Sequence, residues 1–287
     1  MKKIVMLGCE NSHVNTFLTI MKENPDQYRD INVIGVYSED HTAMQQVADT
    51  FGVPTMRSYD QAVGIADGIV VTARHGGKHY PYAKPYIASG IPMFIDKPIT
   101  VEEQEALDFM RECREAGVRL TGGSCCKYAK EIADFKTKIT PGEIRGGLVR
   151  APINMDNPYG GFFFYSQHLV EMLGELFGLY PRAVQAYRAQ GTVNVVFRYE
   201  GYDVIGLYTE QSYHYYISVA LGGQTLASDA SIGMDCFTRE FDEFCELLRG
   251  GAQKQSYGDF IAPVAVLCAI DRSLTSGREE PVHTLEV

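Results

Sequence analysis

The pair Lys97 and Pro98 follows directly after the apolar segment IPMFID, residues 91–96. Open α/β sheets bind their ligands in the crevice at the carboxyl ends of the strands, and proline fixes the backbone beside the lysine. An ammonium group there could stabilise charge on a ligand oxygen. The pair therefore predicts a ligand-binding or catalytic lysine, and the alternative is a solvated lysine that closes a strand.

Tyr165, His168 and Glu171 recur at intervals of three residues within GGFFFYSQHLVEML. On a helix this spacing places the three side chains over one face. Histidine changes its charge near neutral pH and could act as a base, a neighbouring phenol could orient a substrate or relay its proton, and Glu171 could hold the second ring nitrogen. The alternative for His168 is a buried histidine with a structural role.

The segment after the first apolar run reads Gly8, Cys9, Glu10, Asn11, Ser12 and His13. A dinucleotide-binding loop has the pattern GxGxxG, in which the second glycine admits the diphosphate and the third lets the helix pack on the strand. Glu10 and His13 occupy those two positions, and a carboxylate beside a diphosphate is unfavourable. The loop therefore departs from the usual fingerprint.

Two groups of residues raise the question of a metal: His13 with Cys9, and Cys125 with Cys126. Adjacent cysteines rarely chelate one tetrahedral ion, and the chain has no CxxC pair, so the sequence predicts no metal site. Cys9 near a helix start could be a nucleophile, but no motif pairs it with a base.

The elements that must position these residues change character near residue 124. Before it, short apolar runs alternate with amphipathic stretches, which predicts βαβ units and a doubly wound parallel sheet. Helices are predicted from about Asn15, over 41–51 and over 101–116, the last with Thr100 as its N-cap and Gly117 as its stop. The fold class is therefore α/β, with an N-terminal Rossmann domain over residues 1–123.

From residue 124 onward, the predicted helix 129–139 and the strand IRGGLVRAPI precede segments with period-two patterning. VNVVFRYEG, YDVIGLYTEQ and HYYISVALGG alternate apolar and polar residues, which predicts an open, largely antiparallel sheet. Helices over 238–248 and 261–276 follow, and the second is apolar enough to pack back on the first domain. Residues 124–287 are thus predicted to form an α+β domain for substrate binding and oligomerisation.

The composition of the chain limits the kinds of partner that the protein could bind. The 287 residues carry a formal charge of −10, which disfavours nucleic acid, and no run of apolar residues is long enough to predict a membrane-spanning helix. Seven dispersed cysteines indicate reduced thiols and a cytoplasmic protein. Aromatic residues on a two-faced sheet favour self-association, so we expect a homodimer or homotetramer through the C-terminal sheet.

In their order along the chain, these motifs resemble those of the Gfo/Idh/MocA oxidoreductases, whose strand-end motif Glu-Lys-Pro reads Asp96, Lys97 and Pro98 here. The resemblance covers essentially the whole chain. It includes GIVVTA, His79, the pair Lys127 and Tyr128, and FDEFCELLRGG. Within the family, the chain is most similar to a poorly characterised subgroup that has an acidic-x-Ser-His loop and a Tyr-x-x-His followed by Glu.

The resemblance implies an enzyme, an NAD(P)-dependent oxidoreductase that transfers hydride between nicotinamide and a sugar, polyol or related small hydroxyl compound. It assigns catalysis to Lys97 and His168 with Tyr165, and contact with the small-molecule substrate to Lys127, Tyr128, Tyr165 and His168. Cofactor binding is expected of residues at the strand ends: Gly8, Cys9, Glu10, Asn11, Ser12, Tyr37, Ser38, Thr72, Ala73, Arg74, His79, Asp96 and Lys97.

The choice between NAD and NADP stays open, because Tyr37 and Ser38 would not repel a 2′-phosphate, yet no arginine follows to attract one. Arg74 could reach a phosphate or a substrate carboxylate. Two other functions stay open as well. Glu10 and His13 favour a cofactor-free ligand-binding or regulatory protein on the same scaffold, and the resemblance also allows a lyase or hydrolase in which tightly held NAD cycles internally.

Overall fold

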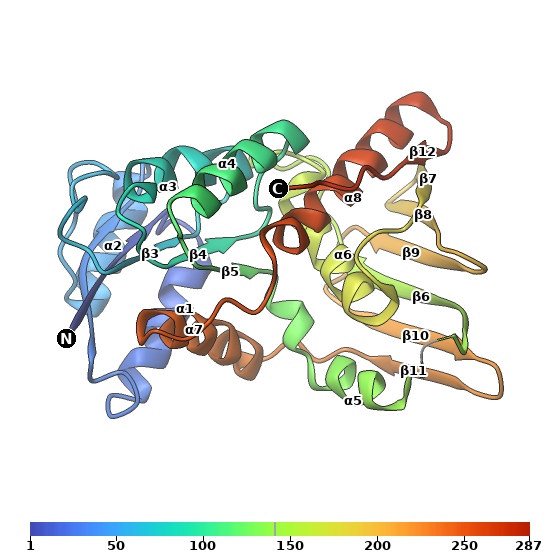
Figure 1. The fold of residues 1–287 in the computed structure, drawn as a ribbon, viewed down its shortest axis with the longest axis horizontal. Helices are drawn as coiled ribbons and strands as arrows, with labels where there is room; N and C mark the ends of the chain where they lie inside the picture. The colour runs from blue at the N-terminus through green and yellow to red at the C-terminus, as the bar shows by residue number, and fades with distance from the viewer. Residues whose placement is uncertain (141) are drawn as a thin grey trace.

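The computed structural model describes residues 1–140 and 142–287, and its two sheets lie at opposite ends of the long axis (Figure 1). The N-terminal sheet is parallel, with strand order β2-β1-β3-β4-β5. Its strands are β1 (Lys2–Leu7), β2 (Ile31–Tyr37), β3 (Gly68–Val71), β4 (Met93–Asp96) and β5 (Leu120–Gly123). The predicted doubly wound parallel sheet is therefore confirmed.

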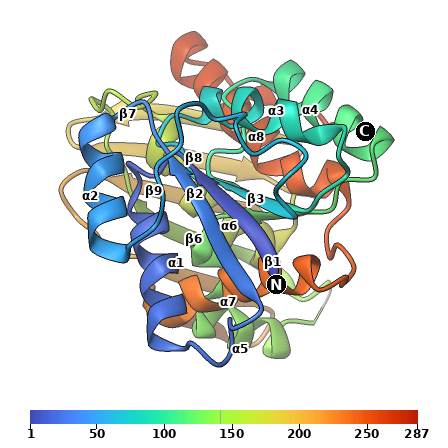
Figure 2. The same ribbon diagram turned by 90° about the vertical axis from the view of Figure 1, so that its left-hand side faces the viewer.

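Helices cover both faces of this sheet (Figure 2). They include α1 (Ser12–Glu23), α2 (His41–Phe51), α3 (His79–Ile87), α4 (Glu103–Glu115) and the short 3₁₀-helix η1 (Gly76–Lys78). One core contains Phe17 of α1 and Val36 of β2, and the other contains Tyr86 of α3 and Phe109 of α4. Burial on both faces explains why the strands β3 and β4 read as continuous apolar runs.

The C-terminal sheet has seven strands in the order β11-β10-β6-β9-β8-β7-β12, and every neighbouring pair except β6 and β9 is antiparallel. Its strands are β6 (Ile144–Pro152), β7 (Ala183–Ala189), β8 (Thr192–Arg198), β9 (Asp203–Thr209), β10 (Tyr216–Leu221), β11 (Thr225–Asp229) and β12 (Glu280–Pro281). The prediction of a largely antiparallel sheet is confirmed. Its inner face packs on α6 (Phe163–Phe177), near α5 (Lys130–Lys138) and the 3₁₀-helix η2 (Cys125–Tyr128).

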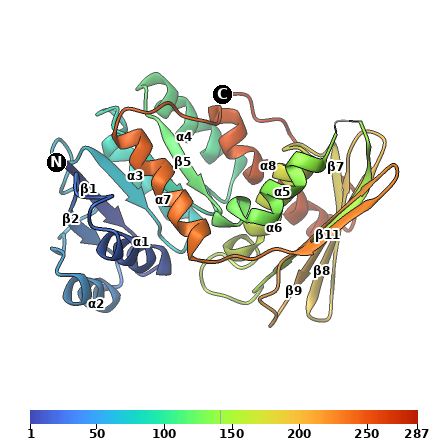
Figure 3. The same cartoon turned by 90° about the horizontal axis from the view of Figure 1, so that it is seen from below.

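The last two helices return to the N-terminal sheet (Figure 3). Phe241 and Phe244 of α7 (Met234–Leu248) share a core with α1 and β1. In α8 (Tyr257–Ser276), Phe260 packs in the N-terminal core and Ile270 packs in the C-terminal core. The domain boundary after residue 123 stays a prediction, and both helices tie the two parts together.

Helix starts differ most from the predictions. Thr100 is not the N-cap of α4: its Oγ1 donates to the Glu102 carbonyl at 2.9 Å, and extended Glu102 precedes the helix. Helix α1 begins at Ser12 because the Asn11 side chain accepts the His13 amide. Helices α7 and α8 begin four residues earlier than predicted, at Met234 and Tyr257. The stop at Gly117, where φ is 67°, is confirmed.

Gly8 ends β1 where the chain passes very close to Ala73. Gly8 has a φ of 87°, and a Cβ atom there would lie 2.2 Å from the Ala73 nitrogen. We expect Gly8→Ala to lower the free energy of unfolding by more than about 2 kcal/mol, because it adds a backbone clash to the strain of a left-handed residue. Urea unfolding followed by circular dichroism measures this loss.

Gly52, the C-cap of α2, is the matched control. Its φ is 69°, but an added Cβ would meet no heavy atom within 4 Å. Gly52→Ala should therefore cost only the conformational strain, about 1 kcal/mol. Equal losses for the two variants would contradict the role of the Gly8 contact.

Candidate active site

A cavity of about 510 Å³ opens at the carboxyl edge of the parallel sheet. Lys97, which follows β4, lines it from one side, and Tyr165 and His168 of α6 line it from the other. Arg74 contributes to the same wall. The structure thus brings together the three residues for which catalysis was predicted, although Lys97 and His168 lie far apart in the chain.

Lys97 is held in place by the first turn of α6. Its Nζ donates to the Phe164 carbonyl at 3.0 Å and lies 4.7 Å from the centre of the Phe164 ring and 5.1 Å from that of Tyr165. Only 4% of the residue is exposed, and this burial lowers the pKa of Lys97 while the Asp96 charge opposes the shift. The ammonium group is therefore fixed at the cavity wall with little water around it.

His168 is oriented through one ring nitrogen. Its Nδ1 lies 2.7 Å from Ser124 Oγ and 3.4 Å from Cys126 Sγ, and the ring of Tyr165 meets it edge to face at 5.3 Å. Among residues 1–140 and 142–287, no hydrogen bond reaches its Nε2. That nitrogen is the atom that can exchange a proton with a bound molecule.

Glu171 does not hold the imidazole, which corrects the sequence hypothesis. Its Oε1 accepts from the Ser124 amide at 3.1 Å and from Gln167 Nε2 at 2.8 Å, and its Oε2 lies 3.6 Å from Lys127 Nζ. The carboxylate sits one turn beyond the ring on α6 and fixes the segment after β5. Glu171 therefore orients His168 only indirectly, through Ser124.

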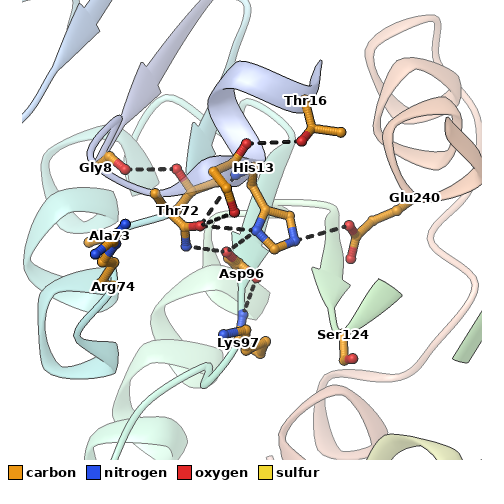
Figure 4. Close-up of polar contacts among 12 residues, drawn as sticks. Gly8, His13, Thr16, Thr72, Ala73, Arg74, Asp96, Lys97, Ser124 and Glu240 are labelled. Carbon is orange, nitrogen blue, oxygen red and sulfur yellow. Dashed lines mark hydrogen bonds and ion pairs between the residues drawn. The ribbon is translucent and has the colours of Figure 1, made fainter. Parts of the chain in front are cut away.

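Asp96 is an internal acceptor at the end of β4. Its Oδ1 accepts from the Lys97 amide at 2.7 Å, its Oδ2 accepts from Asn11 Nδ2 at 3.0 Å, and His13 Nδ1 lies 3.1 Å from Oδ2 (Figure 4). Burial raises the pKa of Asp96 and lowers the pKa of His13 to about 3. Asp96 thus ties the loop after β1 to the lysine, a structural role rather than direct contact with a cofactor.

Glu10 joins three loops at the edge of the sheet. Its Oε2 accepts from Ser38 Oγ at 2.6 Å, after β2, and its Oε1 accepts from the Arg74 amide at 3.1 Å, after β3. The glycine fingerprint is thus replaced by a carboxylate that faces the end of β2. In many Rossmann domains an acidic residue beside that strand holds the adenosine ribose.

Several other predicted cofactor residues support the loops from behind. Thr72 Oγ1 donates to the Gly8 carbonyl at 3.1 Å, and fully buried His79 contacts the Ala73 carbonyl through Nε2 at 2.7 Å. The Tyr37 carbonyl accepts a hydrogen bond from the Gly8 amide.

Cys9 lies in the same loop but is not suited to act as a nucleophile. Burial raises the pKa of Cys9 to about 12, which argues against a reactive thiolate. Asn11 and Ser12, in contrast, line the cavity.

Lys127 and Tyr128 do not join Lys97 and His168. Lys127 Nζ donates to the Gly122 carbonyl at 2.6 Å, and the Tyr128 hydroxyl donates to Glu243 Oε2 at 2.7 Å. Both residues line a separate cavity of about 500 Å³, because η2 turns their side chains toward α5 and α7. The substrate contact predicted for them would require a ligand in that second cavity.

Sequence reasoning missed three groups of residues at the site. Ser124 follows β5, so the rule that picked out Lys97 at a strand end could also have found it. Asn154, Asn157 and Tyr159 line the cavity from the loop before α6, and the Tyr159 hydroxyl accepts from Arg74 Nη1 at 3.0 Å. Glu240 lies on the apolar face of α7, three residues after Phe237 and four residues before Phe244.

Comparisons with known proteins agree with this architecture. Residues 2–124 match the GFO_IDH_MocA family model, an oxidoreductase family with an NAD-binding Rossmann fold. Residues 2–124 are therefore similar to the Gfo/Idh/MocA oxidoreductases, the family that the motifs resemble. A protein of Amycolatopsis mediterranei, assigned as the oxidoreductase subunit of a UDP-kanosamine synthase, is 24% identical over 129 residues. That match spans 44% of this chain and 36% of the relative's length.

Solved structures share the fold over both domains. GenD2 of gentamicin A biosynthesis, in complex with NAD, has a TM-score of 0.84 at 16% identity and covers 98% of this chain and 96% of its own. Myo-inositol 2-dehydrogenase of Lactobacillus plantarum has a TM-score of 0.83 at 12% identity over 98% and 99%. The WlbA dehydrogenase of Chromobacterium violaceum, with NADH and UDP-GlcNAcA, has a TM-score of 0.80 at 16% identity over 100% and 97%.

A membrane-spanning helix is not found in the described part of the chain, where each helix is too short or too polar to cross a bilayer.

Proposed function

We propose that this protein is an NAD-dependent oxidoreductase that transfers hydride between nicotinamide and a sugar, polyol or related small hydroxyl compound. One observation carries the proposal: the ammonium of Lys97 and the imidazole of His168 line the same cavity at the carboxyl edge of a parallel sheet. The family of residues 2–124 binds NAD through this type of domain. The Amycolatopsis mediterranei relative is matched over only 36% of its length, so its name does not identify the activity of this chain.

The cofactor has a suitable place in the fold. The strand order β2-β1-β3 puts a topological switch point between β1 and β3, where open α/β sheets bind nucleotides. The loop of residues 8–12 and the loop of residues 72–75 meet there, and Ser38 with Glu10 lies at the end of β2. These residues would hold the dinucleotide, and a bound nicotinamide would supply the hydride acceptor or donor.

The chain's own residues then supply the charge and the proton transfer. Lys97, fixed by the Phe164 carbonyl, would place its ammonium beside the substrate oxygen and stabilise negative charge there. His168, oriented through Nδ1 by Ser124, would take the hydroxyl proton at Nε2. Tyr165 lies between the two groups and would position the hydroxyl.

The remaining wall of the cavity suits a polyhydroxylated molecule. Asn154 and Tyr213 present amide and phenol groups that donate and accept hydrogen bonds. Arg74 lies 4.9 Å above the Tyr159 ring and could bind a substrate carboxylate. Turnover should therefore be screened with sugars, sugar acids and inositols, with NADH formation followed by absorbance. Copurified NAD without net NADH formation would instead favour the lyase or hydrolase.

The Glu10 carboxylate predicts a preference for NAD over NADP. Its oxygen lies 2.6 Å from Ser38 Oγ, so it could accept from a ribose hydroxyl but would repel a 2′-phosphate. We expect NADH to bind at least about 10-fold more tightly than NADPH, a difference of about 1.4 kcal/mol. Glu10→Gln should reduce the difference in affinity between NADH and NADPH. Fluorescence titration with both nucleotides measures the two dissociation constants.

Glu39→Gln is the control, because Glu39 follows Ser38 but pairs on the surface with Lys78 at 3.2 Å. Glu39→Gln should change the ratio of the NADPH and NADH dissociation constants less than Glu10→Gln does. Tighter binding of NADPH to the wild type would contradict the assignment of Glu10. If neither nucleotide binds at millimolar concentration, the cofactor-free ligand-binding protein becomes the better hypothesis.

We also propose a cytoplasmic homodimer or homotetramer. All seven cysteines are free thiols, which suits a reducing compartment. The outer face of the C-terminal sheet exposes Tyr187 of β7 and Ile205 of β9, by 58% and 39%, which favours self-association there. Light scattering coupled to gel filtration would determine the oligomeric state.

A further inference from the structure

Three buried side chains from distant parts of the chain converge beside the cavity. They are His13 of α1, Cys125 of η2 and Glu240 of α7, and their ligand atoms lie within 4.8 Å of one another. His13 Nε2 and Glu240 Oε2 are 3.7 Å apart and face each other (Figure 4). An imidazole nitrogen, a thiol sulfur and a carboxylate oxygen are the three donor types that zinc prefers in proteins.

Three polar atoms of this cluster have no hydrogen-bond partner among the described residues. Within the described residues, neither carboxylate oxygen of Glu240 has a hydrogen-bond partner, nor does His13 Nε2. Glu240 is fully buried, and a buried carboxyl group without a donor is strongly unfavourable. A bound cation would satisfy all three atoms at once, whereas the 3.7 Å separation is too long for a hydrogen bond between the two side chains.

The second nitrogen of His13 is arranged as in metal-binding histidines. Nδ1 lies 3.1 Å from Asp96 Oδ2 and 3.2 Å from Asn11 Oδ1. Metal-ligating histidines usually donate from their second nitrogen to a carboxylate or a carbonyl, which fixes the tautomer. A proton on Nδ1 leaves the lone pair of Nε2 directed toward Glu240. Asn11 and His13 thus both contribute to this arrangement, and His13 stands at a glycine position of the fingerprint.

We propose that His13, Cys125 and Glu240 bind one zinc ion. Zinc bonds of about 2.0–2.3 Å place tetrahedral ligands roughly 3.3–3.7 Å apart, so a small contraction of the cluster closes the site. A thiolate and a carboxylate carry two negative charges that balance the ion. His13 and Cys125 also line the cavity of Lys97 and His168, so the proposed zinc site would border that cavity.

Cys126 is not part of the proposed ligand set, because its Sγ lies 3.4 Å from His168 Nδ1. The site does not depend on the proposed redox function, since its ligands come from the fold alone. Its test can therefore succeed or fail independently of NAD binding and turnover.

The test uses the full chain, purified without chelators from cells grown with added zinc. Elemental analysis should find about one zinc per chain. After removal of the zinc, titration with Co²⁺ should give visible bands of tetrahedral cobalt and a near-ultraviolet thiolate-to-cobalt absorption. Less than about a tenth of an equivalent of zinc, with no cobalt absorption, would overturn the proposal.

Single substitutions assign the ligands. Cys125→Ser should remove the thiolate-to-cobalt absorption, and Glu240→Gln, which keeps the shape of the side chain, should weaken cobalt binding by at least about 100-fold. Cys268→Ser is the control, because Cys268 is a partly buried thiol in α8 whose Sγ donates to the Val101 carbonyl at 3.7 Å. It should leave both signals unchanged.

Circular dichroism decides whether a variant is folded before it is titrated. Should Cys125→Ser fail to fold, Glu240→Gln still tests the site, since replacing an unpartnered buried carboxyl by an amide of the same size leaves the packing intact. Full metal affinity in a folded Glu240→Gln, or loss of the thiolate absorption in Cys268→Ser, would overturn the assignment.

Discussion

Replacement of Lys97 by methionine is expected to lower kcat by about 100- to 1,000-fold with any substrate that the screen identifies. Lys97 is nearly fully buried and its Nζ donates to the Phe164 carbonyl at 3.0 Å, so the substitution removes a fixed positive charge from the cavity wall. Methionine keeps an unbranched apolar stem against the rings of Phe164 and Tyr165. Steady-state kinetics should therefore reveal a loss of charge stabilisation with little change in NADH binding.

Lys78→Met is the matched control for this substitution. Lys78 lies on the surface, where its ammonium pairs with exposed Glu39. An exposed ion pair contributes little to stability, so activity and thermal unfolding should stay close to those of the wild type. A Lys97→Met protein that folds and retains more than half of the wild-type kcat would remove Lys97 from the mechanism.

His168→Gln is expected to lower kcat by about 100- to 10,000-fold, because an amide cannot accept the hydroxyl proton. Glutamine can still contact Ser124, whose Oγ lies 2.7 Å from Nδ1 of the histidine. The fold should therefore persist, and binding of the reduced cofactor should change little. Single-turnover measurements would place the loss in the chemical step.

His283→Gln is the corresponding control, since His283 is exposed and contacts Glu103 at the surface. Its kcat should match that of the wild type. If His168→Gln turned over at a wild-type rate while folded, the base would have to be another residue of the cavity, with Tyr165 as the next candidate.

Local patterns predicted most of the fold. Continuous apolar runs identified β3 and β4, and period-two alternation identified β8, β9 and β10. A continuous apolar run reflects a strand buried on both faces of its sheet, and period-two alternation reflects a strand buried on one face. Strands β11 and β12 were not predicted, because β11 has no fully buried residue and β12 has only two residues. The return of α7 to the parallel sheet escaped because a helix's apolar face does not say which surface it covers.

At the site, the spacing of residues in the sequence predicted which residues lie there, but not where their side chains point. The strand-end rule and the three-residue spacing singled out Lys97 and His168, which line one cavity. Asp96 and His79 have side chains suited to a ligand, yet both are fully buried and bond to the protein itself. The sequence predicted no metal site, because only residues close together in the sequence could be considered as a ligand set. Glu240, more than a hundred residues from either cysteine pair member, completes the cluster only in the folded chain.

The late position of α7 in the chain has a consequence for biosynthesis. Phe17 of α1 and Phe94 of β4 pack against Phe241 and Phe244, so this surface stays uncovered until α7 has left the ribosome. An apolar surface exposed for that long is prone to aggregate. Fragments that stop before Met234 should therefore need a chaperone, because the core that contains Phe17 cannot be completed before α7 has been synthesised.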